Sequence, residues 1–181
     1  MAALIAPRLS HVGLYVRNVD LMVRFYTELF GLRVTDRGRG RTFKNELVFM
    51  SADPEHHHQL VICSGRPPDA VFSTIMQLSF KADAIDDLRH ITSAAPALGA
   101  TKLFTLNHGN ALSVYFGDPE GNTVEVYVDT PFYVAQPHGD PLDLAKSDSE
   151  IFAETEANCR SDPSFMTAES WRQRFSGGTG V

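Results

Sequence analysis

Cysteine is scarce in this sequence, and clusters of lysine and arginine and long apolar runs are missing from it. The two cysteines, Cys63 and Cys159, lie far apart, which argues against a disulfide scaffold and against a zinc ribbon. The formal net charge of -6, without any basic cluster, argues against a nucleic-acid partner. No stretch has the length of a membrane span, and the N-terminal ten residues lack the pattern of a signal peptide. We therefore expect a cytoplasmic protein that does not enter a membrane.

The length and the apolar content are those of a globular protein. A chain of 181 residues with 43% hydrophobic content can bury roughly 70% of its unfolded surface. That is enough for one ordinary domain or for two small modules.

The first third of the chain shows a strand, a helix and three further strands. In LSHVGLYV (residues 9–16) apolar and polar positions alternate, as in a half-buried strand. Asn18 is a good helix N-cap, and apolar residues follow at helical spacing until Gly31, which predicts an amphipathic helix of about three turns. Three strand candidates follow with turn residues between them, near residues 32–38, 42–50 and 58–64.

The same order of elements is repeated after a linker at residues 65–70. A strand at IMQLSFKA (residues 75–82) leads through Asp83 into a helix at residues 84–94, where Pro96 prevents continuation. Strands are then predicted near residues 102–106, 111–116 and 123–128. This repetition lies in the pattern of elements, and it places Gln77 where His11 stands in the first copy.

Alternation within the strands places polar side chains opposite an apolar row. Val124, Val126 and Val128 form such a row, so Glu125 points to the other face. The polar faces of four strands offer His11, Gln77, Tyr115 and Glu125. If the two units turn these faces toward each other, an imidazole and a carboxylate would suit a divalent metal such as iron or manganese, with positions open for a substrate.

Two motifs resemble one known superfamily. HVGLYVRNVDLMVRFYTELFGLRV and SVYFGDPEGNTVEVYVDTP closely resemble the vicinal oxygen chelate superfamily, which includes glyoxalase I, bleomycin-resistance and fosfomycin-resistance proteins and type I extradiol dioxygenases. The likeness covers roughly residues 8–135 and is greatest to small single-domain extradiol dioxygenases. It implies an α+β fold in which two βαβββ modules, here about residues 8–66 and 72–129, form a cupped mixed sheet around a metal site.

The resemblance also implies the metal ligands. Extradiol dioxygenases bind Fe(II) through two histidines and a glutamate, and His11 and Glu125 match two of these places. The third place holds Gln77, and an amide is a weaker ligand than an imidazole. Glyoxalase-like members use glutamine as a ligand, so we predict His11, Gln77 and Glu125 as metal ligands for Fe(II), with Mn(II) or another divalent ion as alternatives.

Three consecutive histidines, His56, His57 and His58, precede an apolar run. The resemblance to extradiol enzymes places His58 where an imidazole acts as acid or base, and an imidazole suits proton transfer near neutral pH. Alternation instead places His57 on the polar face, so both stay candidates. The alternative without chemistry is a hydrated turn after Asp53 and Pro54.

Two further catalytic candidates come from the same resemblance. Tyr115 lies ten residues before Glu125, as does the extradiol tyrosine that contacts substrate or oxygen, although a packed core tyrosine has the same pattern. His108 resembles the second-sphere histidine of those enzymes, but Asn107-His108-Gly109-Asn110 is also an ordinary tight turn.

The function implied is an extradiol-type dioxygenase that cleaves the ring of a catecholic substrate with O2. A glyoxalase-like isomerase or lyase is the first alternative, and a small-ligand binding protein of the bleomycin-resistance type is the second. We assign residues 1–135 to the domain and residues 136–181 to an extended arm with short helices and a frayed end. Trp171 and Phe175, at i and i+4, are expected to pack onto the cup or a neighbouring subunit, and a homodimer is expected.

Overall fold

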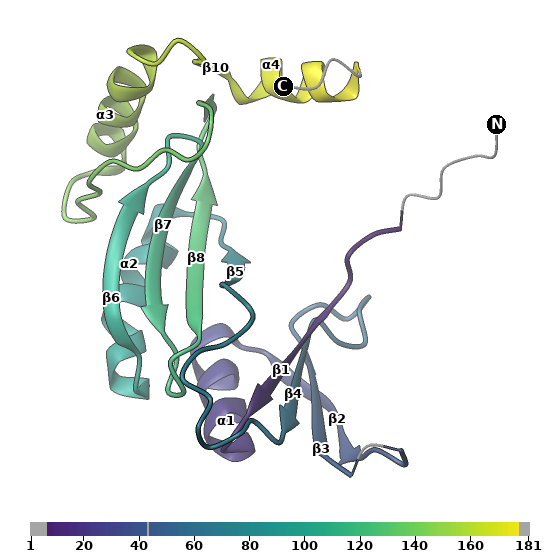
Figure 1. Cartoon of the computed structure of the whole chain (residues 1–181). Helices are drawn as coiled ribbons and strands as arrows, with labels where there is room; N and C mark the ends of the chain where they lie inside the picture. Colours follow the sequence, from purple (N-terminus) through teal and green to yellow (C-terminus); the bar gives the residue numbers. More distant parts are fainter. Residues whose placement is uncertain (1–6, 43, 178–181) are drawn as a thin grey trace, which may run out of the picture. The chain divides into compact units, whose positions relative to one another are not determined.

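The computed structural model describes residues 7–42 and 44–177, and its chain divides into two compact units (Figure 1). The first unit ends at Ser73, and the second begins at Thr74. Each unit contains one four-stranded mixed sheet, and the described residues contain four α-helices. The expected α+β class is therefore confirmed.

The first unit follows the predicted order. Its elements are β1 (Val12–Val16), α1 (Val19–Phe30), β2 (Arg33–Arg39), β3 (Glu46–Ser51) and β4 (Leu60–Ser64). The strands lie in the order β1-β4-β3-β2, with β1 parallel to β4 and the other pairs antiparallel. Asn18 caps α1 by accepting a hydrogen bond from the Leu21 N–H, and Gly31 ends it with a φ of 66° in the left-handed region.

The second unit repeats this topology. Its elements are β5 (Leu78–Lys81), α2 (Ile85–Ala94), the 3-10 helix η1 (Ala95–Leu98), β6 (Thr101–Asn107), β7 (Ala111–Gly117) and β8 (Thr123–Asp129). The order β5-β8-β7-β6 and the single parallel pair, β5 with β8, match those of the first unit. β5 begins 66 residues after β1, as Leu78 compared with Val12 shows. The repeat inferred from pattern alone is therefore confirmed.

The core of the second unit lies between the sheet and α2. Alternate residues of β7 and β8 are buried on the helix side, among them Leu112, Val114, Val124 and Val126. Leu88 of α2 is fully buried against them. The opposite face of the sheet carries the polar side chains, as alternation predicts.

The C-terminal segment adds four short elements to the second unit. They are β9 (Phe132–Tyr133), α3 (Asp148–Arg160), β10 (Met166–Thr167) and α4 (Ala168–Ser176), and β9 pairs with β10. Asn107 at the end of β6 donates a buried hydrogen bond to Thr155 of α3 at 2.8 Å. The division of the chain at residue 135 stays a prediction. A frayed end is expected at residues 176–181; Ser176 is the last residue of α4, and residues 178–181 lie outside the described residues.

Two side chains near the ends of the sheet elements differ in exposure. The strand predicted at residues 75–82 begins only at Leu78, so Met76 lies outside β5 and its side chain is 78% exposed. The side chain of His138 is 18% exposed and contacts Asp140. Within the described part of the chain, no helix is both long and apolar enough to cross a bilayer.

Candidate functional site

A buried carboxylate lies at the centre of the polar face in the second unit. Glu125 is 7% exposed, and each of its two carboxylate oxygens accepts two hydrogen bonds. Oε1 accepts from Tyr115 Oη at 2.5 Å and from Ser113 Oγ at 2.8 Å, and Oε2 accepts from Gln77 Nε2 at 2.7 Å and from Ser79 Oγ at 2.5 Å. Four neutral donors thus surround one negative charge.

The pairing of three strands brings these donors together. Tyr115 of β7 and Ser79 of β5 are the direct cross-strand partners of Glu125 on β8. Ser113 lies two residues before Tyr115 on β7, and Gln77 lies two residues before Ser79, directly before β5. Their side chains therefore emerge on the same face as Tyr115 and Ser79. The valines on either side of Glu125 point into the core. Strand register therefore determines which side chains meet the carboxylate.

An imidazole extends this cluster through the tyrosine. His108 Nε2 lies 2.9 Å from Tyr115 Oη and 4.0 Å from Glu125 Oε1, and His108 Nδ1 lies 2.8 Å from the carbonyl oxygen of His138. His108 lies in the turn between β6 and β7, where Gly109 has a φ of 74°. The backbone of the C-terminal segment therefore helps to orient a side chain that the sheet carries.

The hydrogen bonds of this cluster limit where protons can lie. Since a carbonyl oxygen only accepts, His108 Nδ1 carries hydrogen. If the Tyr115 hydroxyl donates to Glu125, then His108 Nε2 must donate to Tyr115, which makes the imidazole doubly protonated. If Tyr115 donates to a neutral His108 instead, the carboxyl group must carry the proton. The chain from His108 through Tyr115 to Glu125 therefore shares one mobile proton.

Tyr115 itself stays neutral over the physiological range. Burial raises the pKa of its phenol, and the hydrogen bond to the Glu125 carboxylate raises it further. Its ring also stacks on Phe104, with centroids 5.0 Å apart and an interplanar angle of 11°. Phe104 is 52% exposed, so it presents an aromatic face to solvent beside the carboxylate cluster.

The histidine run of the first unit lies in the loop between β3 and β4. His56 pairs with Asp53 at 2.7 Å within this loop. His57 Nε2 lies 2.7 Å from Asp36 Oδ2, and His57 Nδ1 lies 3.0 Å from His58 Nδ1. These histidines precede β4, so the alternation of that strand does not decide which of them is functional.

The same contacts assign a tautomer to His58. A carboxylate accepts, so His57 donates from Nε2 to Asp36, and neutral His57 then accepts from His58 Nδ1. No partner of His58 Nε2 is found among residues 7–42 and 44–177, so its lone pair is available. Partial burial lowers the pKa of His58, and any positive charge on His11 or His57 would lower it further. His58, with this lone pair available, is therefore the candidate proton acceptor of the pair.

His11 lies directly before β1 and contacts this run. Its ring centroid is 4.3 Å from that of His58, and His58 in turn packs edge-on against Phe49 at 5.1 Å. The positions that correspond to Glu125 and Tyr115 by register are Val61 and Phe49 here. The first unit therefore offers imidazoles and an apolar face, and the second unit offers the carboxylate.

The seven predicted site residues fall into two clusters, one within each unit. His57 and His58 lie together in the first unit with His11, and Gln77, His108, Tyr115 and Glu125 lie together in the second unit. Sequence reasoning missed Ser79, Ser113 and Asp36. Ser79 and Ser113 could have been found from the alternation that selected Gln77 and Tyr115, whereas an aspartate on the wholly exposed strand β2 carries no distinguishing signal.

The donor set of the second unit fits a divalent cation. The four groups that donate hydrogen bonds to the Glu125 carboxylate are uncharged, and a cation would supply a counter-charge whenever His108, 4.0 Å away, is neutral. Gln77 touches the carboxylate through its amide, whose oxygen and nitrogen exchange places by rotation. Among residues 7–42 and 44–177, no three His, Cys, Asp or Glu side chains are grouped so as to hold a metal. The predicted set contains only two residues of those types, so the metal site stays a prediction.

Comparison with known proteins gives a family match over most of the chain. Residues 8–126 match the model of the Glyoxalase/Bleomycin resistance protein/Dioxygenase superfamily. Two curated relatives from Rhodococcus globerulus are biphenyl-2,3-diol 1,2-dioxygenase 2, 25% identical over 126 residues, and biphenyl-2,3-diol 1,2-dioxygenase 3, 26% identical over 132 residues. The matches cover 68% and 69% of this chain but only 63% and 65% of the relatives' lengths.

Solved structures share the fold at lower identity. A glyoxylase/bleomycin resistance protein/dioxygenase domain from Frankia sp. EAN1pec is 23% identical with a TM-score of 0.59, over 70% of this chain and 100% of that one. The fosfomycin resistance protein FosX from Listeria monocytogenes, complexed with Mn(II) and sulfate, is 19% identical with a TM-score of 0.54, over 70% and 95% of the two chains.

Proposed function

Because the chain belongs to the Glyoxalase/Bleomycin resistance protein/Dioxygenase superfamily, we propose that it is a metal-dependent, extradiol-type dioxygenase that cleaves the ring of a catecholic substrate with O2. The observation that carries the proposal is the buried chain from His108 through Tyr115 to Glu125. A carboxylate for a metal, with a phenol and an imidazole beside it, can bind an oxygen-rich ligand and move its protons. The two curated relatives are named as dioxygenases of an aromatic diol, which agrees with this chemistry.

We propose His11, Gln77 and Glu125 as the ligands of Fe(II), with Mn(II) as the alternative. The bound ion would act as a Lewis acid and as a template for the two adjacent oxygens of a catechol. Glu125 supplies the negative charge, and Ser79 and Ser113 orient it by donating hydrogen bonds. The histidine and the glutamine would bind as neutral ligands.

We assign proton transfer to His58 in the first unit and to the pair of Tyr115 and His108 in the second unit. His58, with Nε2 available and its tautomer set by His57 and Asp36, accepts a proton from a substrate hydroxyl. Tyr115 keeps its phenolic proton, and its single O–H would turn from Glu125 to developing negative charge on a substrate oxygen. His108 can resupply the proton through the tyrosine. Phe104 offers its exposed face to the planar ring of the substrate.

A second candidate function is favoured by one residue. Gln77 replaces the second imidazole of the ring-cleaving pattern with a neutral amide, which favours a non-redox metal reaction such as a glyoxalase-like isomerisation or lyase reaction. A ligand-binding protein without catalysis is the third possibility. We further propose a homodimer, which light scattering of the purified protein tests.

Oxygen uptake separates these functions. Protein loaded anaerobically with Fe(II) is mixed with catechol or biphenyl-2,3-diol and then given O2. The proposal expects stoichiometric metal, oxygen uptake equal to substrate consumed, and a yellow ring-cleaved product. Stoichiometric metal without oxygen uptake would instead support the second candidate, and ligand binding without metal would support the third.

A pair of variants tests the role of the glutamine. Gln77→His supplies the imidazole that ring-cleaving enzymes carry, so Fe(II) affinity and ring cleavage should both rise. Gln77→Ala removes the amide and should lower both. Equal metal affinity in the wild type and in both variants would show that position 77 is not a ligand.

A further inference from the structure

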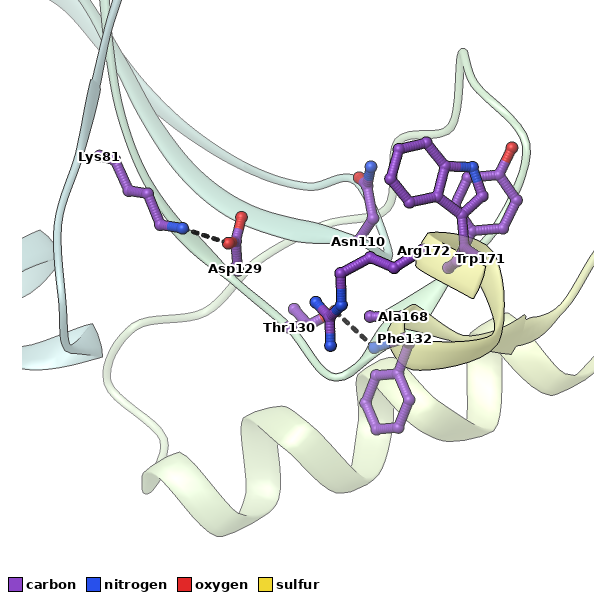
Figure 2. A pocket seen from close by; sticks show the side chains of 9 residues that line it. Lys81, Asn110, Asp129, Thr130, Phe132, Ala168, Trp171 and Arg172 are labelled. Atoms are coloured by element: carbon purple, nitrogen blue, oxygen red, sulfur yellow. Dashed lines mark hydrogen bonds and ion pairs between the residues drawn. The ribbon is translucent and has the colours of Figure 1, made fainter. Parts of the chain in front are cut away.

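A hollow lies on the second unit, apart from the carboxylate cluster. It has a volume of about 400 Å³, within the range of small-molecule sites. The end of β8, the segment around β9 and the first turn of α4 form its walls, and neither Glu125 nor Tyr115 nor His108 lines it. Figure 2 shows Lys81 extending to Asp129 at one end, and Trp171 and Arg172 projecting from α4 at the other.

Aromatic rings form the apolar part of this hollow. Trp171 stacks on Tyr133 with centroids 5.6 Å apart and an interplanar angle of 21°, and Phe175 covers the indole at 5.5 Å. Phe132 adds a further ring to the lining. The pairing of Tyr133 with Met166 and the hydrogen bond from Ala168 N to Pro131 O at 2.9 Å hold α4 against β9. The rings are therefore held in place before any ligand binds.

Polar groups in the hollow are mostly donors. Lys81 is paired with Asp129, so its charge is compensated. Arg172 makes one contact, from a terminal nitrogen to Glu169 at 3.2 Å, which leaves most of its planar fork for another acceptor. Asn110 accepts from Gln136 through Oδ1 at 3.3 Å, and its Nδ2 group has no acceptor within the described part of the chain. The hollow thus presents unused N–H groups beside flat rings.

We propose that this hollow binds a planar aromatic carboxylate. The ring of the ligand packs against Trp171 and Phe132, and its carboxylate accepts from the Arg172 guanidinium and from Asn110 Nδ2. The planar fork of arginine matches a carboxylate through two parallel hydrogen bonds. An organic cation is disfavoured because Lys81 and Asp129 compensate each other and Arg172 adds a positive charge to the lining. The site does not depend on the proposed reaction, since it shares no residue with the proposed catalytic groups.

The hollow is lined by an intrinsic fluorophore, Trp171. Trp171 is the only tryptophan in the chain, so fluorescence excited at its absorption edge reports on the hollow alone. Biphenyl-4-carboxylate is the probe, and biphenyl-4-methanol, which has the same rings without the charge, is its matched neutral control. We expect saturable quenching of Trp171 by both compounds, with the acid binding at least about 10-fold more tightly, as expected for a charge-assisted hydrogen bond.

Three variants assign the roles of the lining residues. Arg172→Gln should weaken the acid about 10-fold to 100-fold and leave the alcohol unchanged. Arg174→Gln removes the same charge from the same helix outside the hollow and should change neither. Phe132→Leu should weaken both compounds alike, and Glu125→Gln should leave both affinities unchanged even if it abolishes ring cleavage.

Three results would overturn the proposal. Equal affinities for the acid and the alcohol would remove the role of Arg172, and quenching that does not saturate would mean that no site exists. Quenching that depends on protein concentration in place of probe concentration would show that the hollow is a contact between copies of the chain. Circular dichroism of each variant ensures that a lost signal is not lost folding.

Discussion

Tyr115 donates a hydrogen bond of 2.5 Å to the buried carboxylate of Glu125, its direct partner across the β7 and β8 strands. This contact joins the only carboxylate of the polar cluster to the imidazole of His108. It therefore links the proposed metal site to the proposed source of protons.

Replacing Tyr115 tests the proton role. Tyr115→Phe keeps the stacking on Phe104 but removes the hydroxyl that joins His108 to Glu125. We expect kcat for ring cleavage to fall about 100-fold to 10,000-fold, as for the loss of a general acid. The free energy of unfolding should fall by only about 1 kcal/mol, because Ser113 still donates to Oε1.

Tyr127→Phe, on β8 two residues beyond Glu125, is the matched control and should keep full activity. Stopped-flow measurement of product formation gives kcat for both variants. If Tyr115→Phe retains wild-type kcat, the tyrosine is a packing residue.

Replacing Glu125 tests the metal site. Glu125→Gln keeps the shape but removes the charge and turns one acceptor into a donor that faces other donors. We expect affinity for Mn(II) to fall at least about 100-fold, since even the loss of an outer-shell partner costs up to that amount. Titration calorimetry with Mn(II) measures it without any need for activity.

The control is Glu156→Gln on α3, where the carboxylate pairs with Arg160 on the surface. It should leave Mn(II) affinity unchanged. A Glu125→Gln protein that binds Mn(II) as the wild type does would exclude Glu125 as a ligand.

Gly109 is expected to tolerate no side chain. Its φ of 74° is in the left-handed region, and a Cβ would lie 2.6 Å from Val134 Cγ2 and 2.9 Å from Cys159 Sγ. Gly109→Ala should lower the free energy of unfolding by about 2 to 4 kcal/mol, through backbone strain and overpacking together. It should also displace His108 and so lower activity.

Gly121→Ala provides the comparison for Gly109→Ala. Gly121 has a similar φ of 80° but open space around it. Its replacement should cost only the backbone term, about 1 to 2 kcal/mol. Urea unfolding of both variants tests the difference, and equal losses would mean that crowding at Gly109 is relieved at no cost.

The capping box of α3 should make stability depend on pH. Hydrogen bonds from the side chain and then the backbone of Ser147 lower the pKa of Glu150. A lowered pKa in the folded state means that the contribution is present above the unfolded value of about 4.5 and is lost as the pH falls through the folded pKa. Glu150→Gln should therefore destabilise the protein more at pH 7 than at pH 3.

The Ser147→Ala background gives the control for this pH effect. Without the serine hydroxyl, Glu150→Gln should have a smaller effect at pH 7, which a double-mutant cycle measures by urea unfolding. An effect of Glu150→Gln that is the same at both pH values would contradict the assignment.

The sequence by itself determined the local elements and their repetition. Asn18 and Gly31 bound α1 as predicted, because capping depends on residues within one turn of the helix end. The alternation of Val124 and Val126 with Glu125 predicted which face carries the carboxylate, because successive side chains of a strand point to opposite faces. The 66-residue repeat followed from the same patterns.

Only the tertiary structure decided which side chains touch. Ser79 and Ser113 meet Glu125 because β5 and β7 pair with β8 in one register, and no local pattern records the register of distant strands. Asp36 meets His57, and the carbonyl of His138 meets His108, through segments 21 and 30 residues apart. The aromatic hollow likewise exists because β10 pairs with β9 and brings Trp171 to Tyr133. Such contacts arise when the chain closes on itself, so they cannot be inferred from neighbours in the sequence.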